Sequence, residues 1–295
     1  MTVTLLVQSI LAGLTNGFVY GLIGLGIAVV YRGARVINAM QGDIALIGGV
    51  MAYLASVPLG LPMPIGFLIG VVAGGLTGFL VDKLMIRPTL KRRGTEDSLL
   101  LVTLGGAFAV SAAVLLYFGR DSYPMPGIGG NDIVDVFDAS IRVHAIWLIV
   151  ISLIVVTALR WFYSRTLTGQ ALLAASIDPD GALTLGIDVG RMRAITFGLG
   201  GLVGGLAGVL VSPLINIQYE MGLLLTLKGF AAAILGGISS PFGAIFGGVL
   251  LGLIESLAIV TISSGYKDVV SMTLLIAIMI VLPQGLFGRR GRSGG

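Results

Sequence analysis

Cysteine is absent from the 295 residues of the chain, and histidine occurs once, at position 144. The lack of cysteine excludes disulfides and thiol chemistry on either side of a membrane. The single His144 provides neither a His-based metal site nor a plausible catalytic triad. Charged residues make up only 11% of the chain, whereas soluble domains contain about 25%. Because so few charges cannot cover a water-exposed surface, the composition predicts an integral membrane protein.

Motifs for nucleotide binding and catalysis are also missing. A phosphate-binding loop needs Gly-Lys followed by Ser or Thr, and none of the four lysines follows a glycine. Intramembrane proteolysis would need a Ser–His pair, a zinc-binding helix or two facing aspartates, but Asp43 and Asp82 both lie near predicted membrane borders. The first residues, MTVTLLVQSI, lack the basic start of a cleaved signal peptide. We therefore expect a protein that is not an enzyme and needs no cofactor or metal.

Long apolar runs dominate the sequence, which is 56% hydrophobic. Their length favours helices over a β-barrel, whose strands are short and alternating. We expect an all-α polytopic membrane protein, a single transmembrane domain over 1–295, with about eight transmembrane helices plus broken or re-entrant segments. A span needs about 20 apolar residues. The predicted spans are 5–31, 36–57, 62–82, 98–118, 143–163, 193–217 and 268–287, with a longer apolar region at 229–262.

The basic residues indicate an orientation. Segments 83–97, 160–193 and 289–292, together with Arg32 and Arg35, hold 14 of the 18 Lys and Arg residues. Short loops rich in Lys and Arg stay in the cytoplasm, so these segments and the C-terminus are predicted to be cytoplasmic. The 119–142 loop, with four aspartates, and the N-terminus are predicted to lie outside.

The 229–262 region begins after Lys228 and contains Glu255. Residues 228–255 read KGFAAAILGGISSPFGAIFGGVLLGLIE, with seven glycines and a Ser-Ser-Pro. We expect a short segment, a break and a longer helix, which together re-enter the membrane or cross it once or three times. Irregular backbone at membrane depth is tolerated only against protein or a water-filled cavity. The predicted hinge residues are Gly236, Gly237, Ser239, Ser240, Pro241 and Gly243.

Glycines recur four residues apart on several predicted spans. Such spacing lets helix backbones approach closely in a membrane. Because it occurs on different spans, we expect a densely packed helix bundle. The repeats are Gly13-Gly17-Gly21, Gly70-Gly74-Gly78, Gly200-Gly204-Gly208, Gly243-Gly247 and Gly248-Gly252.

Polar residues inside apolar spans are candidates for a translocation pathway, because an ionisable group there is costly and usually faces a cavity or a partner. Simpler roles remain open for several. Asp43 could cap a helix starting at Ile44, Glu220 and Lys228 could lie at an aqueous interface, and Glu255 could be a buried structural group. The candidates for the pathway are Asn38, Gln41, Asp43 and Glu255.

The loop at about 164–193 carries helix signals that a plain linker does not need. Asp178 is a good N-cap, Pro179 suits the first helical position and Gly186 suits a helix stop, and a second helical stretch covers 170–176. We interpret the loop as a docking surface for a soluble partner, although a helical hairpin linker remains an alternative. The docking residues are predicted to be Gly169, Gln170, Ala174, Asp178, Pro179, Asp180 and Gly186.

Several motifs together resemble the permease subunits of bacterial ABC importers for branched-chain amino acids, a family that includes urea and short-amide permeases. The resemblance runs nearly end to end. In the second span the family usually reads N-F-A-H-G-E, whereas this chain has Gln41 and Asp43 at the His and Glu positions. The matching stretches are NAMQGD (38–43), Arg87-Pro88, GQA (169–171), LGI (185–187), AAILGGISSPFGAIFGGVLLGLIES (232–256), YKDVV (266–270) and LPQGLFG (282–288).

This resemblance implies an inner-membrane subunit that moves a small polar or zwitterionic solute, with branched-chain amino acids expected first and urea or short amides as alternatives. It implies a second homologous permease, two ATP-binding subunits that hydrolyse ATP and dock on the 169–188 segment, a periplasmic substrate-binding protein, and membrane lipid, but no nucleic acid. A competing interpretation is a secondary transporter or channel working alone, which would more often carry paired ionisable residues at mid-depth.

Overall fold

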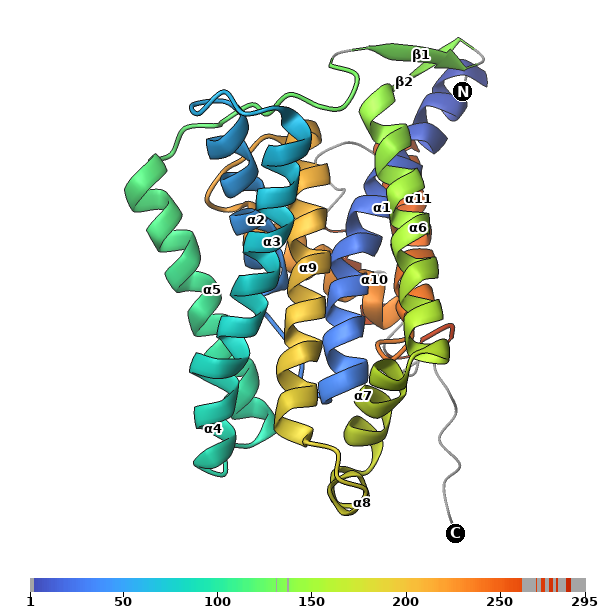
Figure 1. Ribbon diagram of the computed structural model, residues 1–295. Helices are drawn as coiled ribbons and strands as arrows, with labels where there is room; N and C mark the ends of the chain where they lie inside the picture. Colours follow the sequence, from blue (N-terminus) through green and yellow to red (C-terminus); the bar gives the residue numbers. More distant parts are fainter. Residues whose placement is uncertain are drawn as a thin grey trace.

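The computed structural model describes residues 3–261 apart from 131 and 137, and beyond them residues 269, 272–273, 276–277, 280 and 285–287. These residues form a helical bundle with one small antiparallel hairpin (Figure 1), which confirms the predicted all-α polytopic fold. The elements are α1 (Val3–Ala34), α2 (Gln41–Ser56), α3 (Met63–Val81), the π-helical turn η1 (Asp82–Ile86), α4 (Arg87–Lys91), α5 (Glu96–Phe118), β1 (Ile133–Val136), β2 (Ala139–Arg142), α6 (Val143–Arg165), α7 (Leu167–Ile177), α8 (Pro179–Thr184), α9 (Val189–Ile215), α10 (Met221–Gly236) and α11 (Pro241–Thr261).

Six helical stretches in the described part of the chain are long and apolar enough to cross a membrane: Thr4–Ala34, Met63–Lys91, Glu96–Phe118, Val143–Arg165, Val189–Ile215 and Pro241–Thr261. Helices α2 and α10 have 16 residues each, short of the roughly 20 that a span needs. The predicted span 268–287 lies largely outside the described residues. The expected number of about eight spans is therefore approximate.

The predicted span 36–57 is shorter than expected, because α2 begins only at Gln41. Upstream, Arg35 has a left-handed φ of 55°, and residues 35–40 connect α1 to α2 without helical structure. The Asn38 side chain accepts the Met40 N–H at 3.1 Å, and the Ala39 N–H donates to Thr103 Oγ1 at 3.2 Å. These bonds satisfy backbone groups that would otherwise be unpaired inside the bundle.

Glycine contacts hold the central helices together. Gly17 and Gly21 of α1 lie against the backbone of α11, and Gly74 of α3 lies against Gly205 of α9. A side chain on Gly208 would collide with the Ala45 carbonyl of α2. Packing through small residues, as predicted from the four-residue spacing, is how membrane helices approach closely.

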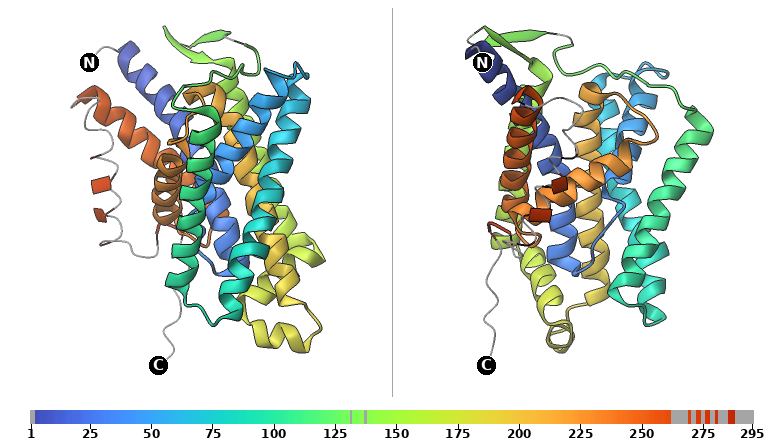
Figure 2. Two further views of the ribbon diagram at one scale, coloured as in Figure 1. Left: turned by 90° about the vertical axis from the view of Figure 1, so that its left-hand side faces the viewer. Right: turned by 180° about the vertical axis from the view of Figure 1, so that it is seen from behind.

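The basic loops share one end of the bundle. Helices α4, α7 and α8 lie at one end, which we call the basic end, and the β1–β2 hairpin and the start of α1 lie at the opposite end, which we call the hairpin end (Figures 1 and 2). Segments 83–97 and 160–193 therefore lie opposite the aspartate-containing 119–142 connection, in agreement with the predicted segregation of charge.

The 229–262 region is broken, as predicted. Helix α10 runs obliquely across the bundle, starting against α2 and ending against α11, and α11 then runs back toward the hairpin end beside α1 (Figure 2). How many times the 229–262 region crosses a membrane stays a prediction, because the chain that follows it lies largely outside the described residues. The short helix begins at Met221, earlier than the predicted 229.

Candidate functional site

A buried ion pair joins the two helices on either side of the break. Lys228 Nζ of α10 lies 3.0 Å from Glu255 Oε2 of α11, and both side chains are at most a tenth exposed. The Tyr20 hydroxyl of α1 donates to Glu255 Oε1 at 3.3 Å, and Lys228 Nζ lies 5.5 Å from the centre of the Tyr20 ring. The interpretation that Lys228 sits at an aqueous interface is therefore wrong.

The ion pair faces a cavity of about 250 Å³ between α1, the 215–220 linker, α10 and α11. Glu255 and Lys228 line it together with amide side chains of Asn16, Asn216 and Gln218. Tyr20 and a second acidic residue, Glu220, also line it, and the rest of its wall is apolar and includes Val19, Leu224 and Leu225. Glu255 is thus both a partner in a buried ion pair and part of a cavity wall. Its interpretation as a buried structural group is therefore compatible with its interpretation as a pathway residue.

Asn38 and Gln41 form a second buried cluster, away from the ion pair. Asn38 Nδ2 donates to Gln41 Oε1 at 3.3 Å, and Gln41 Nε2 donates to the Gly200 carbonyl of α9 at 2.9 Å. Gln41 also packs against Gly26 of α1, leaving no room for a side chain there. Asn38 and Gln41 therefore connect the non-helical 35–40 segment to α9 and α1.

Asp43 lies in the first turn of α2, where α10 also begins. It does not cap a helix starting at Ile44, because α2 starts two residues before Asp43 with Met40 at the N-cap position. Asp43 Oδ1 accepts the Ser111 hydroxyl of α5 at 2.8 Å and lies against Gly222 of α10. Its Oδ2 is buried without a hydrogen-bond partner in the described part of the chain. The four predicted pathway residues thus fall into separate places: Asn38, Gln41 and Asp43 around the start of α2, and Glu255 at the cavity.

The break between α10 and α11 is closed by specific hydrogen bonds. Gly237 has a φ of 99°, a conformation that favours glycine, and Ser240 Oγ accepts the Gly243 N–H at 3.0 Å as the cap of α11. Pro241 occupies the first position of α11, and Gly236 packs on the Gly243 backbone.

The end of α10 is capped from far along the chain. The Leu286 and Phe287 N–H groups donate to the Leu235 and Gly236 carbonyls at 2.9 and 3.1 Å, and the Phe287 ring stacks edge-on against Phe242 and Phe246 of α11. Carbonyls at a helix end inside a membrane need such partners. The break between α10 and α11 is therefore stabilised by specific hydrogen bonds and ring contacts.

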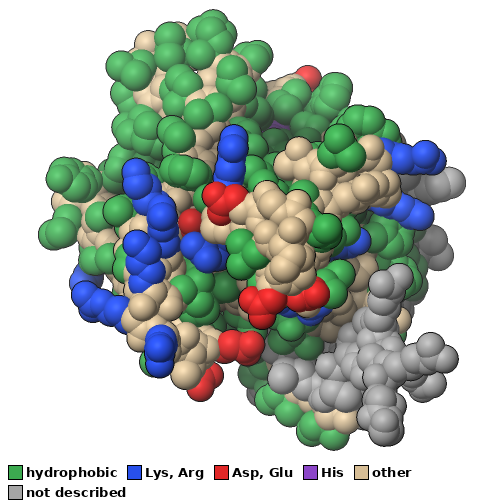
Figure 3. Space-filling model, turned by 60° about the horizontal axis from the view of Figure 1, so that its bottom comes forward, with side chains coloured by type: hydrophobic (Ala, Val, Ile, Leu, Met, Phe, Trp, Pro, Cys, Tyr) green, Lys and Arg blue, Asp and Glu red, His purple; other side chains and the backbone are tan. Residues whose placement is uncertain are grey.

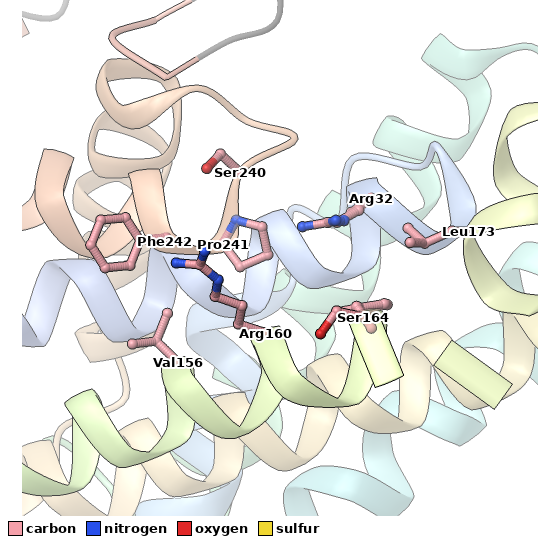
Figure 4. A pocket seen from close by; sticks show the side chains of 9 residues that line it. Arg32, Val156, Arg160, Ser164, Leu173, Ser240, Pro241 and Phe242 are labelled. Atoms are coloured by element: carbon pink, nitrogen blue, oxygen red, sulfur yellow. The ribbon is translucent and has the colours of Figure 1, made fainter. Parts of the chain in front are cut away.

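A cavity of about 440 Å³ separates the break from α6 and α7 at the basic end. Arg32 of α1 and Arg160 of α6 extend toward Ser240 and Pro241, and Leu173 of α7 borders the same space (Figure 4). The Arg32 guanidinium also lies 5.0 Å from the centre of the Tyr163 ring. The hinge residues and α7 thus border one space.

The predicted docking loop is a helical hairpin at the far tip of the basic end (Figure 1). Seen from that end, the surface carries many Lys, Arg, Asp and Glu side chains among apolar ones (Figure 3). Thr166 caps α7 through the Gly169 N–H at 3.0 Å, and Asp178 caps α8 through the Gly181 N–H at 2.9 Å. Gly186, with a φ of 78°, ends the second helix. The local helix signals predicted both helices correctly.

Exposed apolar side chains cluster on the second half of this hairpin. Ile177, Leu183 and Leu185 are 72%, 58% and 80% exposed. Among the predicted docking residues, Gln170, Asp178, Pro179, Asp180 and Gly186 are exposed and Ala174 is half-buried, whereas Gly169 is buried against the Phe162 backbone. Gly169 is therefore a packing residue of the hairpin and does not present a surface.

Two polar contacts had no counterpart in the sequence-based expectations. Tyr20 was not a candidate, although it contacts Glu255, and Arg193 at the start of α9 lies 2.6 Å from Asp82 of η1. The opposite charges of Lys228 and Glu255, at the two ends of one broken apolar run, were a signal for their pairing. Nothing in the sequence indicated which residue of α1 would meet them.

Comparison with known proteins gives consistent results. Residues 9–279 match the sequence family described as branched-chain amino acid transport system / permease component. The chain is 30% identical to the high-affinity branched-chain amino acid transport system permease protein LivH of Escherichia coli (strain K12), over 96% of this chain and 95% of LivH. It is also 30% identical to the corresponding permease BraD of Pseudomonas aeruginosa, with the same coverage.

A more distant relative and one solved structure extend this likeness. The probable branched-chain amino acid transport permease protein LivH of Methanocaldococcus jannaschii is 29% identical over 90% of this chain and 88% of its own. The fold is similar to that of PsaBC from Streptococcus pneumoniae in complex with Fab, with a TM-score of 0.51 at 14% identity, over 96% of this chain and 94% of that one.

Proposed function

Because the chain belongs to the family of permease components of branched-chain amino acid transport systems, we propose that it is the membrane permease subunit of an ATP-driven importer for a branched-chain amino acid. The observation that carries the ATP-driven part is the capped α7–α8 hairpin, which exposes Ile177, Leu183 and Leu185. Apolar side chains held on a rigid tip beyond the bundle fit a soluble partner.

In this proposal two ATP-binding subunits dock on α7 and α8 in the cytoplasm. A second, homologous permease pairs with this chain, and a periplasmic binding protein delivers the solute at the hairpin end. The basic end is cytoplasmic, as positively charged short loops favour, so the N-terminus is periplasmic and the C-terminus cytoplasmic, in the inner membrane of a bacterium.

The break between α10 and α11 provides the moving part. Leu173 of α7 and Ser240 at the break border one cavity, so a displacement of the docking hairpin has room to reach the hinge. Rotation of the backbone at Gly237–Ser240 changes the packing of α10 against α11 and α1. It thereby changes the shape of the cavity that Lys228 and Glu255 line. Such helix shifts are a common form of alternating access.

Uptake by reconstituted vesicles tests the proposal. Vesicles containing this chain and its partner subunits are expected to accumulate leucine only under two conditions. ATP must be present on the side of the membrane where the ATP-binding subunits lie, and the binding protein must be present on the opposite side. Leu185→Asp is expected to lower ATP-driven uptake at least tenfold, because it puts a charge into the apolar docking surface, whereas Arg92→Ser on the other basic-end loop serves as control. Leucine entry without ATP would instead support a stand-alone protein, a secondary transporter if an ion gradient drives accumulation or a channel if leucine only equilibrates. Uptake of urea or short amides in place of leucine would change the proposed substrate.

A further inference from the structure

The cavity of about 440 Å³ between the break, α6 and α7 is lined by positive side chains and hydroxyl groups. Arg32 of α1 and Arg160 of α6 both extend into it (Figure 4), and none of the described residues that border it is acidic. Arg160 is exposed and forms no ion pair with another described residue. Arg32 has other contacts as well, among them the Tyr163 ring at 5.0 Å, so Arg160 is the principal positive charge of this cavity.

Two hydroxyl groups at the cavity can still donate a hydrogen bond. Tyr163 is 3% exposed, and its hydroxyl has no hydrogen-bond partner in the described part of the chain. Ser240 Oγ accepts the Gly243 N–H, which leaves the hydrogen of its own hydroxyl for another acceptor. The hydroxyl of Ser164 is already used, because it donates to the Trp161 carbonyl at 3.2 Å. Donors and positive charge together call for an anionic acceptor, and arginine binds phosphate oxygens particularly well through its planar set of N–H groups.

The depth of the cavity in the membrane follows from α6. No charged residue lies between His144 and Arg160, and at 1.5 Å per residue this part of the helix is about 24 Å long, somewhat less than the roughly 30 Å of the hydrocarbon core. Trp161, which follows Arg160, is 63% exposed, and tryptophan favours the level of the lipid headgroups. Leu153, two turns before Arg160 on the same face, is exposed as well. Arg160 therefore lies where headgroups meet acyl chains.

We infer that this cavity binds the phosphate group of an anionic phospholipid. Arg160 and Arg32 are the charged ligands, the Tyr163 and Ser240 hydroxyls donate to the remaining phosphate oxygens, and the acyl chains lie on the face of α6 that carries Leu153. Basic pockets between membrane helices bind the headgroups of anionic lipids on the cytoplasmic side. The site is separate from the path of the solute and goes beyond the proposed transport function.

A second cavity, of about 550 Å³, adjoins the first and has Arg32 and Ser240 in common with it. It provides room for the rest of a headgroup beside the phosphate. Arg35 also borders this second cavity, but it borders a further one that contains Glu96, so its charge is not counted toward the site.

The bound phosphate would contact parts of the chain that are far apart in the sequence. Arg32 belongs to α1, Arg160 to α6 and Ser240 to the break before α11. A lipid that holds these three together stabilises the observed arrangement of the break against α6. Its binding is therefore expected to raise the Tm of the protein.

Native mass spectrometry and thermal unfolding of the full-length chain in detergent test the site without ATP or partner subunits. Phosphatidylglycerol is expected to remain bound and to raise the Tm, whereas phosphatidylcholine with the same acyl chains, whose headgroup has no net charge, is not. Arg160→Gln is expected to weaken phosphatidylglycerol binding roughly tenfold, as the loss of a hydrogen bond to a charged group does. Arg165→Gln, on the same helix but outside the cavity, is the matched control and should bind like the wild type. Equal binding by the two variants overturns the site, because it shows only a general attraction to the basic end.

Tyr163→Phe removes the hydroxyl and no charge. It is expected to weaken phosphatidylglycerol binding while the Tm without lipid does not fall, because this hydroxyl has no hydrogen-bond partner among the described residues. Wild-type binding by Tyr163→Phe overturns the assignment of the phosphate to this cavity.

Two further measurements separate the lipid from other occupants. Inorganic phosphate added with phosphatidylcholine is expected to leave the Tm unchanged, and a rise with phosphate alone overturns the lipid as the source of the phosphate group. The complete transporter is expected to retain phosphatidylglycerol. Its loss when the ATP-binding subunits are added overturns the proposal and assigns the cavity to an acidic segment of a partner.

Discussion

Asp43 of α2 accepts a hydrogen bond from Ser111 of α5, with 2.8 Å between Oδ1 and Oγ. Apart from this bond and the Thr103 contact to Ala39, α5 is attached to the bundle chiefly through packing, and only four of its 23 residues are buried. The carboxylate also lies where α2 and α10 both begin. The bond therefore joins α2 to α5 at a point where the Asp43 carboxylate also packs against Gly222 of α10.

Ser111→Ala is expected to destabilise the protein, because it leaves the buried Asp43 carboxylate without its donor. An orphaned buried acceptor costs about 1–3 kcal/mol, more if charged, and a lower Tm in detergent measures the effect. Ser111→Thr keeps the hydroxyl and should restore most of the stability. Equal Tm values for Ser111→Ala and the wild type would show that this bond contributes little.

Gly208→Ala is expected to weaken the contact between α9 and α2. Its methyl group would collide with the Ala45 backbone, and overpacking of this kind costs about 1–3 kcal/mol. Gly198→Ala on the same helix is the matched control, since a methyl group there meets open space. Thermal unfolding of both variants decides the matter, and a larger loss for Gly198→Ala would contradict the observed packing.

Asp178→Ala is expected to loosen α8, because Asp178 Oδ1 accepts the Gly181 N–H and caps the helix. Loss of an N-cap costs about 1 kcal/mol. Hydrogen exchange over residues 179–184 should accelerate roughly fivefold, which corresponds to that energy. Asp178→Asn keeps a capping oxygen and should exchange at nearly the wild-type rate. Unchanged exchange in Asp178→Ala would mean that the hairpin is held by its docking partners or packing alone.

Gly285→Ala is expected to open the cap at the end of α10. Gly285 has a φ of 72°, and a methyl group there would collide with the Ile234 carbonyl and Gly237. Gly60→Ala shares the left-handed strain, at φ 64°, but meets no neighbour, so it isolates the backbone cost of about 1–2 kcal/mol. Protease cleavage at 237–240 should increase in Gly285→Ala only, and similar cleavage in both variants would contradict the role of this cap.

The local sequence was sufficient for much of this protein. Long apolar runs with few charges predict membrane helices because the hydrocarbon core admits little else. Asp178, Pro179 and Gly186 predict α8 because caps and stops act within a single turn. The Ser-Ser-Pro at 239–241 predicts the break for the same reason, and four-residue glycine spacing predicts close packing between helices.

Contacts between distant segments were decided only by the tertiary structure. No local pattern places Tyr20 on Glu255, ties Gln41 to the Gly200 carbonyl, or brings Leu286 to the end of α10, because each contact depends on how helices far apart in the chain cross one another. Lys228 illustrates the difference: its charge alone suggested an aqueous interface, and only the crossing of α10 over α1 and α11 buries it beside an opposite charge. The sequence by itself determined a bundle of membrane helices with one broken segment and a capped helical hairpin at 167–184, and the packing of those helices decided which polar residues meet and where the cavity lies.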